Sequence, residues 1–218
     1  MTDLHTHTLL SDGVLLPTEL AQRAKVIGYR VIGITDHADS SNLEHVATSL
    51  LKVRQEMGDT LGIKIICGVE LTHVPPQLLS GMVDRARSFG CQLVIVHGQT
   101  IVEPVEPGTN RAALECDIDI LAHPGLISDD DVKRAAARDI CLEITTRAGH
   151  SYTNGHVAQL AKKYGARLVL NTDSHGPSDL ITSDFAKKVV LGAGLGSKDF
   201  DNMRQNAEWL VKKIETRK

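Results

Sequence analysis

Residues 63–97 read IKIICGVELTHVPPQLLSGMVDRARSFGCQLVIVH, and they contain a complete strand-helix-strand unit. Apolar, β-branched runs at 63–69 and 93–96 are typical of buried strands. The segment between them has helical periodicity near residues 77–89. Two strands that are joined through a helix pair in parallel, so this unit predicts a parallel sheet.

The same alternation continues over the whole chain. Further strands are predicted at residues 2–5, 31–35, 118–122, 140–144 and 167–170. Helical patterns fall near residues 17–27, 43–57, 109–115, 129–138, 155–164, 183–191 and 199–215. An eight-unit barrel spends roughly 31 residues per unit, and the chain has 218 residues. Residues 1–218 therefore predict a single α/β domain, a TIM-type barrel of seven units, with a doubly wound open sheet as the alternative.

Composition excludes several classes of protein. The net charge is −3 and aromatic residues make up 3% of the chain, which disfavours a protein that coats nucleic acid. No apolar run is long enough for a membrane span, and no basic leader precedes an apolar signal core, so we expect a cytoplasmic protein. The cysteines form no CxxC pair and predict buried thiols, at Cys67, Cys91, Cys116 and Cys141. The oligomeric state stays open.

Ionisable residues follow or end every predicted strand. They are His5, His7, Asp36, His37, Glu70, His97, His123, Glu143, Asp173 and His175. The carboxyl ends of all strands share one face of a parallel barrel, so these side chains should meet in one pocket. Histidines two residues apart on a strand, such as His5 and His7, point to the same face. Imidazoles mixed with carboxylates suit Zn²⁺, Fe²⁺ or Mn²⁺, and the sequence therefore predicts a metal cluster.

Motifs spread over residues 3–175 resemble those of one known family. They are Asp3-Leu-His5-Thr-His7-Thr8 with Ser11-Asp12-Gly13, Ile34-Thr35-Asp36-His37, Gly68-Val-Glu70, Val96-His97-Gly98, Ala122-His123-Pro124-Gly125, Leu142-Glu143-Ile144 and Asn171-Thr-Asp173-Ser-His175. In this order they resemble the polymerase and histidinol phosphatase (PHP) family of metal-dependent phosphoesterases. The resemblance implies a distorted seven-unit (β/α) barrel.

The resemblance also implies a cluster of three divalent ions, with Zn²⁺ expected and Mn²⁺ or Fe²⁺ as alternatives. The implied ligands are His5, His7, Asp12, His37, Glu70, His97, His123, Asp173 and His175. Glu70 is expected to bridge two of the ions. Asp3 and Asp36 are expected to orient imidazoles, while Asn171 and Glu143 shape the pocket.

A phosphate ester needs positive charge beyond the metals, and Arg147 is the expected clamp because its guanidinium matches two oxygens. His150 is a candidate general acid and substrate contact. Weaker substrate-binding candidates are Asn154, Gln99 and Thr100, and His73 and Arg111 could reach the pocket. His45 and His156 fall in helical patterns and are expected at the surface.

The expected activity is hydrolysis of a small phosphomonoester, with histidinol phosphate as the named candidate. A hydroxide that bridges two ions would be the nucleophile. The alternatives are a phosphodiesterase or nuclease acting on nucleotides or DNA ends, and a metal-stabilised regulatory module without turnover. No membrane partner is expected, and nucleic acid is disfavoured as a partner.

We expect gently purified protein to carry more than two equivalents of transition metal, because nine ligands are too many for one or two ions that keep open positions. Elemental analysis is the measurement. One equivalent or less in active protein would contradict the three-ion cluster.

Overall fold

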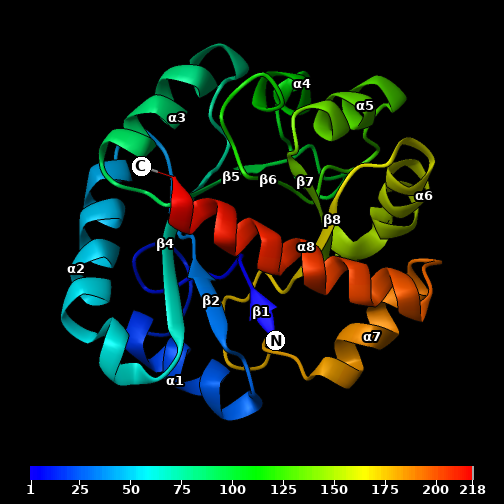
Figure 1. The fold of residues 1–218 in the computed structure, drawn as a ribbon. Coiled ribbons are helices and arrows are strands. Elements are labelled where there is room, and N and C mark those ends of the chain that lie inside the picture. The colour runs from blue at the N-terminus through cyan, green and yellow to red at the C-terminus, as the bar shows by residue number, and fades with distance from the viewer. Residues whose placement is uncertain (218) are drawn as a thin grey trace.

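The computed structural model describes residues 1–217, and its centre is a parallel sheet that curls into a nearly closed barrel (Figure 1). The strands are β1 (Thr2–Asp3), β2 (Val31–Ile34), β3 (His37–Ala38), β4 (Lys64–Leu71), β5 (Leu93–His97), β6 (Ile120–Ala122), β7 (Cys141–Thr145) and β8 (Leu168–Asn171). Their order is β1-β2-β4-β5-β6-β7-β8, and β3 pairs with β4. A parallel bridge between Thr6 and Ser174 joins the two edges. The seven-unit barrel is thereby confirmed over the open sheet.

Helices follow the strands as predicted. They are α1 (Pro17–Ile27), α2 (Leu43–Leu61), α3 (Leu79–Ser88), α4 (Thr109–Ala113), α5 (Asp129–Ala137), α6 (Asn154–Tyr164), α7 (Ser183–Gly192) and α8 (Ser197–Thr216), with short 3₁₀ helices at Pro76–Leu78 and His150–Thr153. Figure 1 shows α1 to α7 around the ring of strands, whereas α8 (red) lies across it. No helix within residues 1–217 has the length and apolarity needed to cross a bilayer.

Three details differ from the expected strands. β3 is an additional short strand, because the chain leaves β2 at Thr35 and pairs again with β4 at His37, opposite Glu70. β1 ends at Asp3, so His5 and His7 lie in the irregular segment that follows it. Glu143 occupies the middle of β7 and not its end.

Two glycines allow neighbouring backbone segments of the barrel to touch. A Cβ at Gly68 in β4 would lie 2.4 Å from the carbonyl oxygen of Leu93 in β5. Gly125 has φ +64°, and a Cβ there would lie 1.8 Å from the carbonyl oxygen of Gln99. Only glycine fits such contacts. Gly68 therefore lets β4 lie close to the first residue of β5, and Gly125 brings the loops after β5 and β6 together at the carboxyl end of the barrel.

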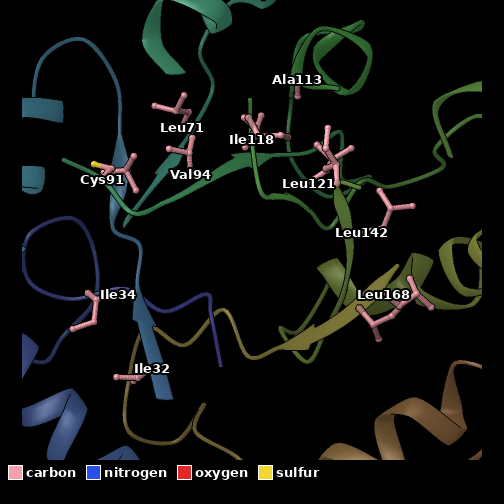
Figure 2. Close-up of a cluster of buried hydrophobic side chains, with 14 of the residues drawn as sticks. Ile32, Ile34, Leu71, Cys91, Val94, Ala113, Ile118, Leu121, Leu142 and Leu168 are labelled. Carbon is pink, nitrogen blue, oxygen red and sulfur yellow. The ribbon is translucent and has the colours of Figure 1, made fainter. Parts of the chain in front are cut away.

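Apolar side chains form two layers. The outer layer fills the space between the strands and the surrounding helices, as Figure 2 shows for residues such as Ile34, Val94 and Leu142. The inner layer fills the amino-terminal half of the barrel, where α8 packs against the strands. It contains Leu4, Ile66, Leu93, Ile95, Ile120, Ala122, Cys141 and Val169 from the barrel, with Ala207, Leu210, Val211 and Ile214 from α8. The final helix therefore closes the end of the barrel opposite the predicted pocket.

A buried carboxylate helps to hold α8 in place. Asp119 precedes β6 and has no exposed surface. Arg217, directly after α8, lies 2.8 Å from Asp119 Oδ1, and Arg87 of α3 lies 2.8 Å from Asp119 Oδ2. Two guanidinium groups thus compensate the buried charge and tie the end of α8 to the sheet.

The four cysteines are free and buried, as predicted. Cys141 lies in the inner layer beside α8. Cys67 occupies the middle of β4, where its thiol contacts the carbonyl oxygen of Leu50 in α2. Its side chain therefore points outward to a helix and away from the pocket.

Leu210→Ala should lower the free energy of unfolding by about 2–5 kcal/mol, because it leaves a cavity between α8 and the barrel interior. Leu191→Ala in α7 is the matched control, because Leu191 is 49% exposed. Urea unfolding at constant metal concentration measures both. Equal, small losses in the two variants would mean that α8 does not support the barrel.

Candidate metal centre

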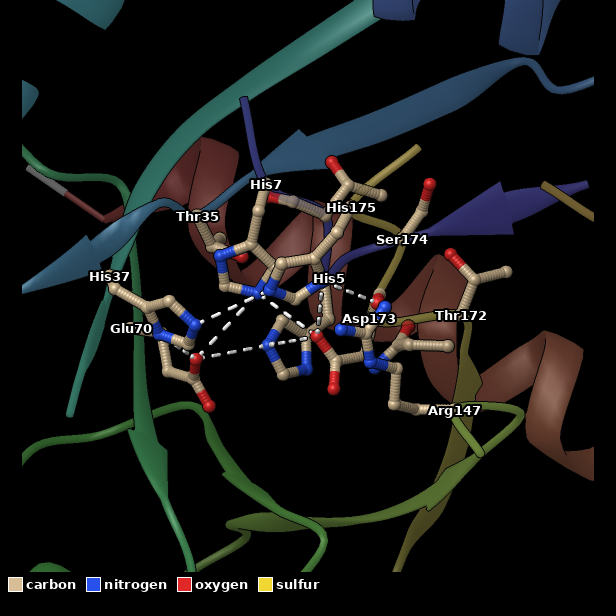
Figure 3. Close-up of polar contacts among 12 residues, drawn as sticks. His5, His7, Thr35, His37, Glu70, Arg147, Thr172, Asp173, Ser174 and His175 are labelled. Carbon is tan, nitrogen blue, oxygen red and sulfur yellow. Dashed lines mark hydrogen bonds and ion pairs between the residues drawn. The ribbon is translucent and has the colours of Figure 1, made fainter. Parts of the chain in front are cut away.

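All nine predicted ligand side chains meet at the carboxyl end of the barrel. Figure 3 shows His5, His7, His37, Glu70, Asp173 and His175 pointing toward one another from separate segments. Potential ligand atoms lie within 4.8 Å of one another in several groups among residues 1–217. These groups are His7-Asp12-His37-His175, His5-His7-Glu70, His5-His123-Asp173, His97-His123-His150 and His73-His97-Glu103.

Glu70 lies at the centre of the cluster and has no exposed surface. Its Oε2 is 3.3 Å from His5 Nε2, 3.7 Å from His7 Nε2 and 2.8 Å from His37 Nδ1. Its Oε1 is 3.5 Å from His123 Nε2. The two oxygens thus face different imidazoles, which is the arrangement that a bridging carboxylate requires.

Asp12, His37 and His175 form a triangle of ligand atoms. Asp12 Oδ1 lies 3.6 Å from His37 Nε2 and 3.2 Å from His175 Nε2, and the two imidazole nitrogens are 3.4 Å apart. Metal bonds of about 2.0–2.1 Å in tetrahedral geometry separate neighbouring ligand atoms by about 3.3 Å. The edges of this triangle match the face of such a site.

Buried polar atoms without a hydrogen-bond partner concentrate in the same cluster. They include His5 Nε2, His7 Nδ1 and Nε2, Glu70 Oε1, His123 Nδ1 and Asp173 Oδ1. An unpaired buried polar atom is costly, and native proteins rarely tolerate several together. Divalent cations would satisfy these atoms, so the donor set fits metal binding.

The pKa shifts of the clustered residues also agree with metal binding. Burial alone would lower the pKa of His5, but the carboxylates of Glu143, Glu70 and Asp173 raise it well above its usual range. Burial opposes the charge of Glu70, yet His5 and His37 hold the pKa of its carboxyl well below its usual range. The carboxylates are therefore ionised and attract cations, and metal binding would release protons from the imidazoles.

The backbone is strained at three residues of the pocket. His73, His123 and Asp173 have φ values of 51°, 25° and 52°. Positive φ is uncommon for residues other than glycine and tends to occur where function requires it. Asp173 and His123 belong to the predicted ligand set, whereas His73 was expected only to reach the pocket.

Glu143 orients one of the imidazoles. His5 Nδ1 lies 2.8 Å from Glu143 Oε1, and the amide of Asn171 donates to the same oxygen at 2.8 Å. Glu143 Oε2 accepts the backbone N–H of His123 at 3.1 Å. Glu143 thus presents His5 Nε2 to the cluster and also fixes the backbone of His123.

The expectation that Asp3 and Asp36 orient imidazoles is wrong. Asp3 accepts hydrogen bonds from the hydroxyl of Thr172 and from the backbone of His5. Asp36 accepts from Thr8 and from the hydroxyl of Ser11. Both carboxylates therefore shape the loops that carry ligands, because they bind backbone and hydroxyl donors and do not reach the rings.

His150 lies among the imidazoles. Its ring stacks on that of His123 with centroids 4.2 Å apart, and its Nδ1 is 2.9 Å from the hydroxyl of Thr100. Burial and then the neighbouring His123 lower the pKa of His150 to about 4. The roles of His150 as general acid and substrate contact stay predictions.

The sequence did not predict Glu103 as a residue of the site. It follows β5 by six residues, and its carboxylate lies 3.1 Å from His97 and 3.3 Å from His150. Hydrogen bonding to His97 lowers the pKa of Glu103 to about 2. Its sequence context, Glu103-Pro104-Val105-Glu106-Pro107, gives no periodic signal, and only the folded loop brings it to the pocket.

Arg147 follows β7, and Figure 3 shows it at the edge of the cluster. Its Nη1 is 3.4 Å from Asp179 Oδ2. That same oxygen accepts the backbone N–H groups of His175 and Gly176, both at 2.9 Å. Arg147 is therefore attached to the loop that carries His175.

The remaining residues that were expected to contact substrate or reach the pocket bind other residues of the protein. Asn154 pairs through both ends of its amide with the backbone of Thr145. Gln99 accepts from the backbone of Asn110. Arg111 pairs with Asp131. Substrate contacts by Asn154, Gln99 and Thr100 stay predictions.

The two histidines that were expected at the surface differ in their exposure to solvent. His45 is exposed on α2. His156 is only half-buried, and its ring contacts the carbonyl oxygen of Ile127 at 2.8 Å. Neither residue belongs to the groups of potential ligands.

Comparison with known proteins gives one consistent result. The sequence model of the PHP domain matches residues 3–217. An uncharacterised protein of Methanocaldococcus jannaschii is 48% identical over 92% of this chain and 93% of its own length. A probable phosphatase of Clostridium novyi is 28% identical over 79% of this chain and 78% of its own. Ribonuclease P protein component 3 of Methanosarcina mazei is 29% identical over 78% of this chain and 71% of its own.

Glu143→Gln should weaken metal binding by about 10- to 100-fold, since an amide no longer fixes the orientation of His5 as a carboxylate does. Equilibrium dialysis with metal analysis measures the effect. Glu56→Gln, an exposed change on α2, is the control. An unchanged binding curve for Glu143→Gln would show that the orientation of His5 does not depend on this carboxylate.

Proposed function

This chain belongs to the PHP domain family of phosphoesterases, and from that premise we propose that it is a metal-dependent enzyme that hydrolyses a small phosphomonoester. One observation carries the proposal. Buried imidazole and carboxylate atoms face one another without hydrogen-bond partners at the open end of the barrel. The relationship to a probable phosphatase supports the same reaction class.

In this proposal three divalent ions are held by the nine residues named above, with Zn²⁺ expected and Mn²⁺ or Fe²⁺ as alternatives. His5, His7, Glu70 and Asp173, whose ligand atoms fall in overlapping groups, would hold one ion. Asp12, His37 and His175 would hold another, and His97 and His123 would hold the third together with Glu70. Bound divalent ions supply Lewis-acid polarisation of the phosphoryl group and a water of lowered pKa.

The residues of the chain itself bind and orient the ester. Arg147 donates to phosphoryl oxygens as negative charge redistributes on them. Asp179 holds the guanidinium near the loop of His175, which limits its freedom before substrate arrives. Thr100 fixes His150 through its hydroxyl, so the imidazole keeps one orientation beside His123.

A phosphodiesterase acting on nucleotides or nucleic acid ends is the second candidate. The relationship to a ribonuclease P protein component favours it. The net charge of −3 and the low aromatic content of 3% argue against a long nucleic-acid groove. We therefore place phosphomonoesters first, with histidinol phosphate as one member of the panel to be tested.

A substrate panel tests the proposal. Metal-loaded protein should release phosphate from small phosphomonoesters and act more slowly on matched phosphodiesters, and a chelator should abolish both activities. Glu70→Gln should remove activity, because an amide does not bridge two cations as a carboxylate does. Full activity in protein stripped of metal, or faster turnover of diesters, would contradict the proposal.

Arg147→Ala should lower kcat/KM by about 10²- to 10³-fold, the usual loss for one preorganised donor. Metal content should stay constant, because guanidinium is not a metal ligand. Arg147→Lys should recover part of the rate, since a point charge replaces a two-pronged donor. The loss should be larger for monoesters than for diesters, and equal losses would favour the phosphodiesterase.

A further inference from the structure

Basic side chains are almost absent from the connections that surround the candidate metal centre. These connections lead from each strand to the next helix and lie at the carboxyl end of the barrel. Within them Arg147 is the one lysine or arginine among residues 1–217. Glu103 and Glu106, in the connection after β5, are negative and are half-buried and exposed, respectively. Apart from metal ions, a substrate therefore meets a single fixed positive charge.

Large apolar side chains are exposed in the same connections. They form an apolar rim that consists of Val14, Ile101, Val102, Leu126 and Tyr152, which are between 44% and 74% exposed. Over the part of the chain that the structure describes, no large apolar side chain is exposed in a loop that leads from a helix to a strand. The exposed apolar surface of the loops is therefore restricted to the end of the barrel at which the metal ligands meet.

Val102 lies beside the loop that carries the expected phosphate clamp. A Cβ at Gly149 would lie 3.5 Å from both methyl carbons of Val102, and Gly149 follows Arg147 by two residues. Thr100, two residues before Val102, contacts Nδ1 of His150 at 2.9 Å. Val102 is therefore held against the loop of Arg147, next to the imidazoles of the cluster.

Val14 lies beside the second loop to which the clamp is attached. Its N–H donates to the carbonyl oxygen of His175 at 2.8 Å, and a Cβ at Gly176 would lie 3.4 Å from Val14 Cγ2. Asp179 accepts the N–H of Gly176 and pairs with the guanidinium of Arg147. Val14 and Val102 thus contact the two loops that Asp179 joins, and an ester bound by Arg147 has apolar surface on both.

The charges and the apolar rim together restrict the alcohol part of the ester. The metal ions and Arg147 compensate the charge of one phosphoryl group. A second anionic group on the substrate would have no further cation to pair with and would lie near Glu103 and Glu106, which repel it. An apolar group gains instead, because each methylene that leaves water completely tightens binding by about fourfold.

We propose that the enzyme is specific for phosphomonoesters of uncharged, apolar alcohols, and that Val14 and Val102 contact the alcohol part. The proposal rests on the proposed function, because it requires a phosphoryl group bound at the metal centre and at Arg147. Esters that carry further anionic groups, such as nucleoside polyphosphates and nucleic acid ends, are then poor substrates.

Binding of inert phosphonates to the metal-loaded protein tests the specificity without turnover. Butylphosphonate, 3-aminopropylphosphonate and 3-phosphonopropionate have chains of similar length that end in a methyl, an ammonium and a carboxylate group, and methylphosphonate lacks the chain. Isothermal titration calorimetry measures the four dissociation constants. Butylphosphonate should bind about 5- to 50-fold tighter than methylphosphonate, since three further carbons leave water partly or completely. Both charged chains should bind at least about fivefold weaker than butylphosphonate.

A double variant tests the two valines. Val14→Thr with Val102→Thr keeps the shape of both side chains and replaces one methyl of each with a hydroxyl. It should lower the ratio of butylphosphonate to methylphosphonate affinity by at least about threefold, while methylphosphonate affinity and metal content stay constant. Val26→Thr on α1, which is 76% exposed, is the matched control and should keep the wild-type ratio. Circular dichroism checks that each variant is folded.

Three results would overturn the inference. They are equal affinity for butylphosphonate and methylphosphonate, tightest binding of a charged chain, and a wild-type ratio in the double variant. If all four ligands bind equally and the wild type, unlike the double variant, self-associates in sedimentation, the apolar rim is a contact between copies of the chain.

The proposed function fails in a different way. Binding in the expected order without hydrolysis of any phosphomonoester would reject the reaction and keep the apolar binding site. Failure of every phosphonate to bind the metal-loaded protein would reject the phosphoryl site, and with it the specificity.

Discussion

Glu70 is a carboxylate without exposed surface that lies among imidazoles from several segments of the chain. A buried charge is tolerated only when it is paired, and here the partners come from the segment after β1, from β3 and from the loop after β6. These partners meet only when the barrel closes. The bridge between Thr6 and Ser174, which joins the two edges of the sheet, therefore belongs to the same assembly as the site.

The two halves of the barrel interior differ in the kind of side chain that fills them. Its amino-terminal half is apolar and is closed by α8, which adds Leu210 and Ile214 to the inner layer. Its carboxyl-terminal half contains imidazoles and carboxylates with unpaired buried atoms, which cost stability in the protein alone. Cations that bind only the folded state would raise the free energy of unfolding and so offset part of that cost. Burial of apolar side chains in the amino-terminal half can offset the cost of the strained backbone at His123 and Asp173.

Access to the cluster is controlled by side chains on the loops. Arg147, tethered through Asp179, and Glu103, directly before Pro104, carry opposite charges at the edge of the pocket. A phosphate ester that enters the pocket would meet the positive guanidinium of Arg147 and the negative carboxylate of Glu103. These two charges can discriminate esters by the number of negative oxygens.

Sequence alone determined the number of βα units, the seven strands of the main sheet path and the common end at which His5, Glu70 and His175 meet, because hydrophobic periodicity and parallel pairing are local rules. It did not reveal that α8 closes the barrel, since an amphipathic pattern does not identify the surface against which a helix packs. It also assigned imidazole contacts to Asp3 and Asp36 that Glu143 makes instead. Only tertiary structure decided those contacts and the position of Glu103, because loop conformation and mutual burial bring together residues whose spacing along the chain has no period.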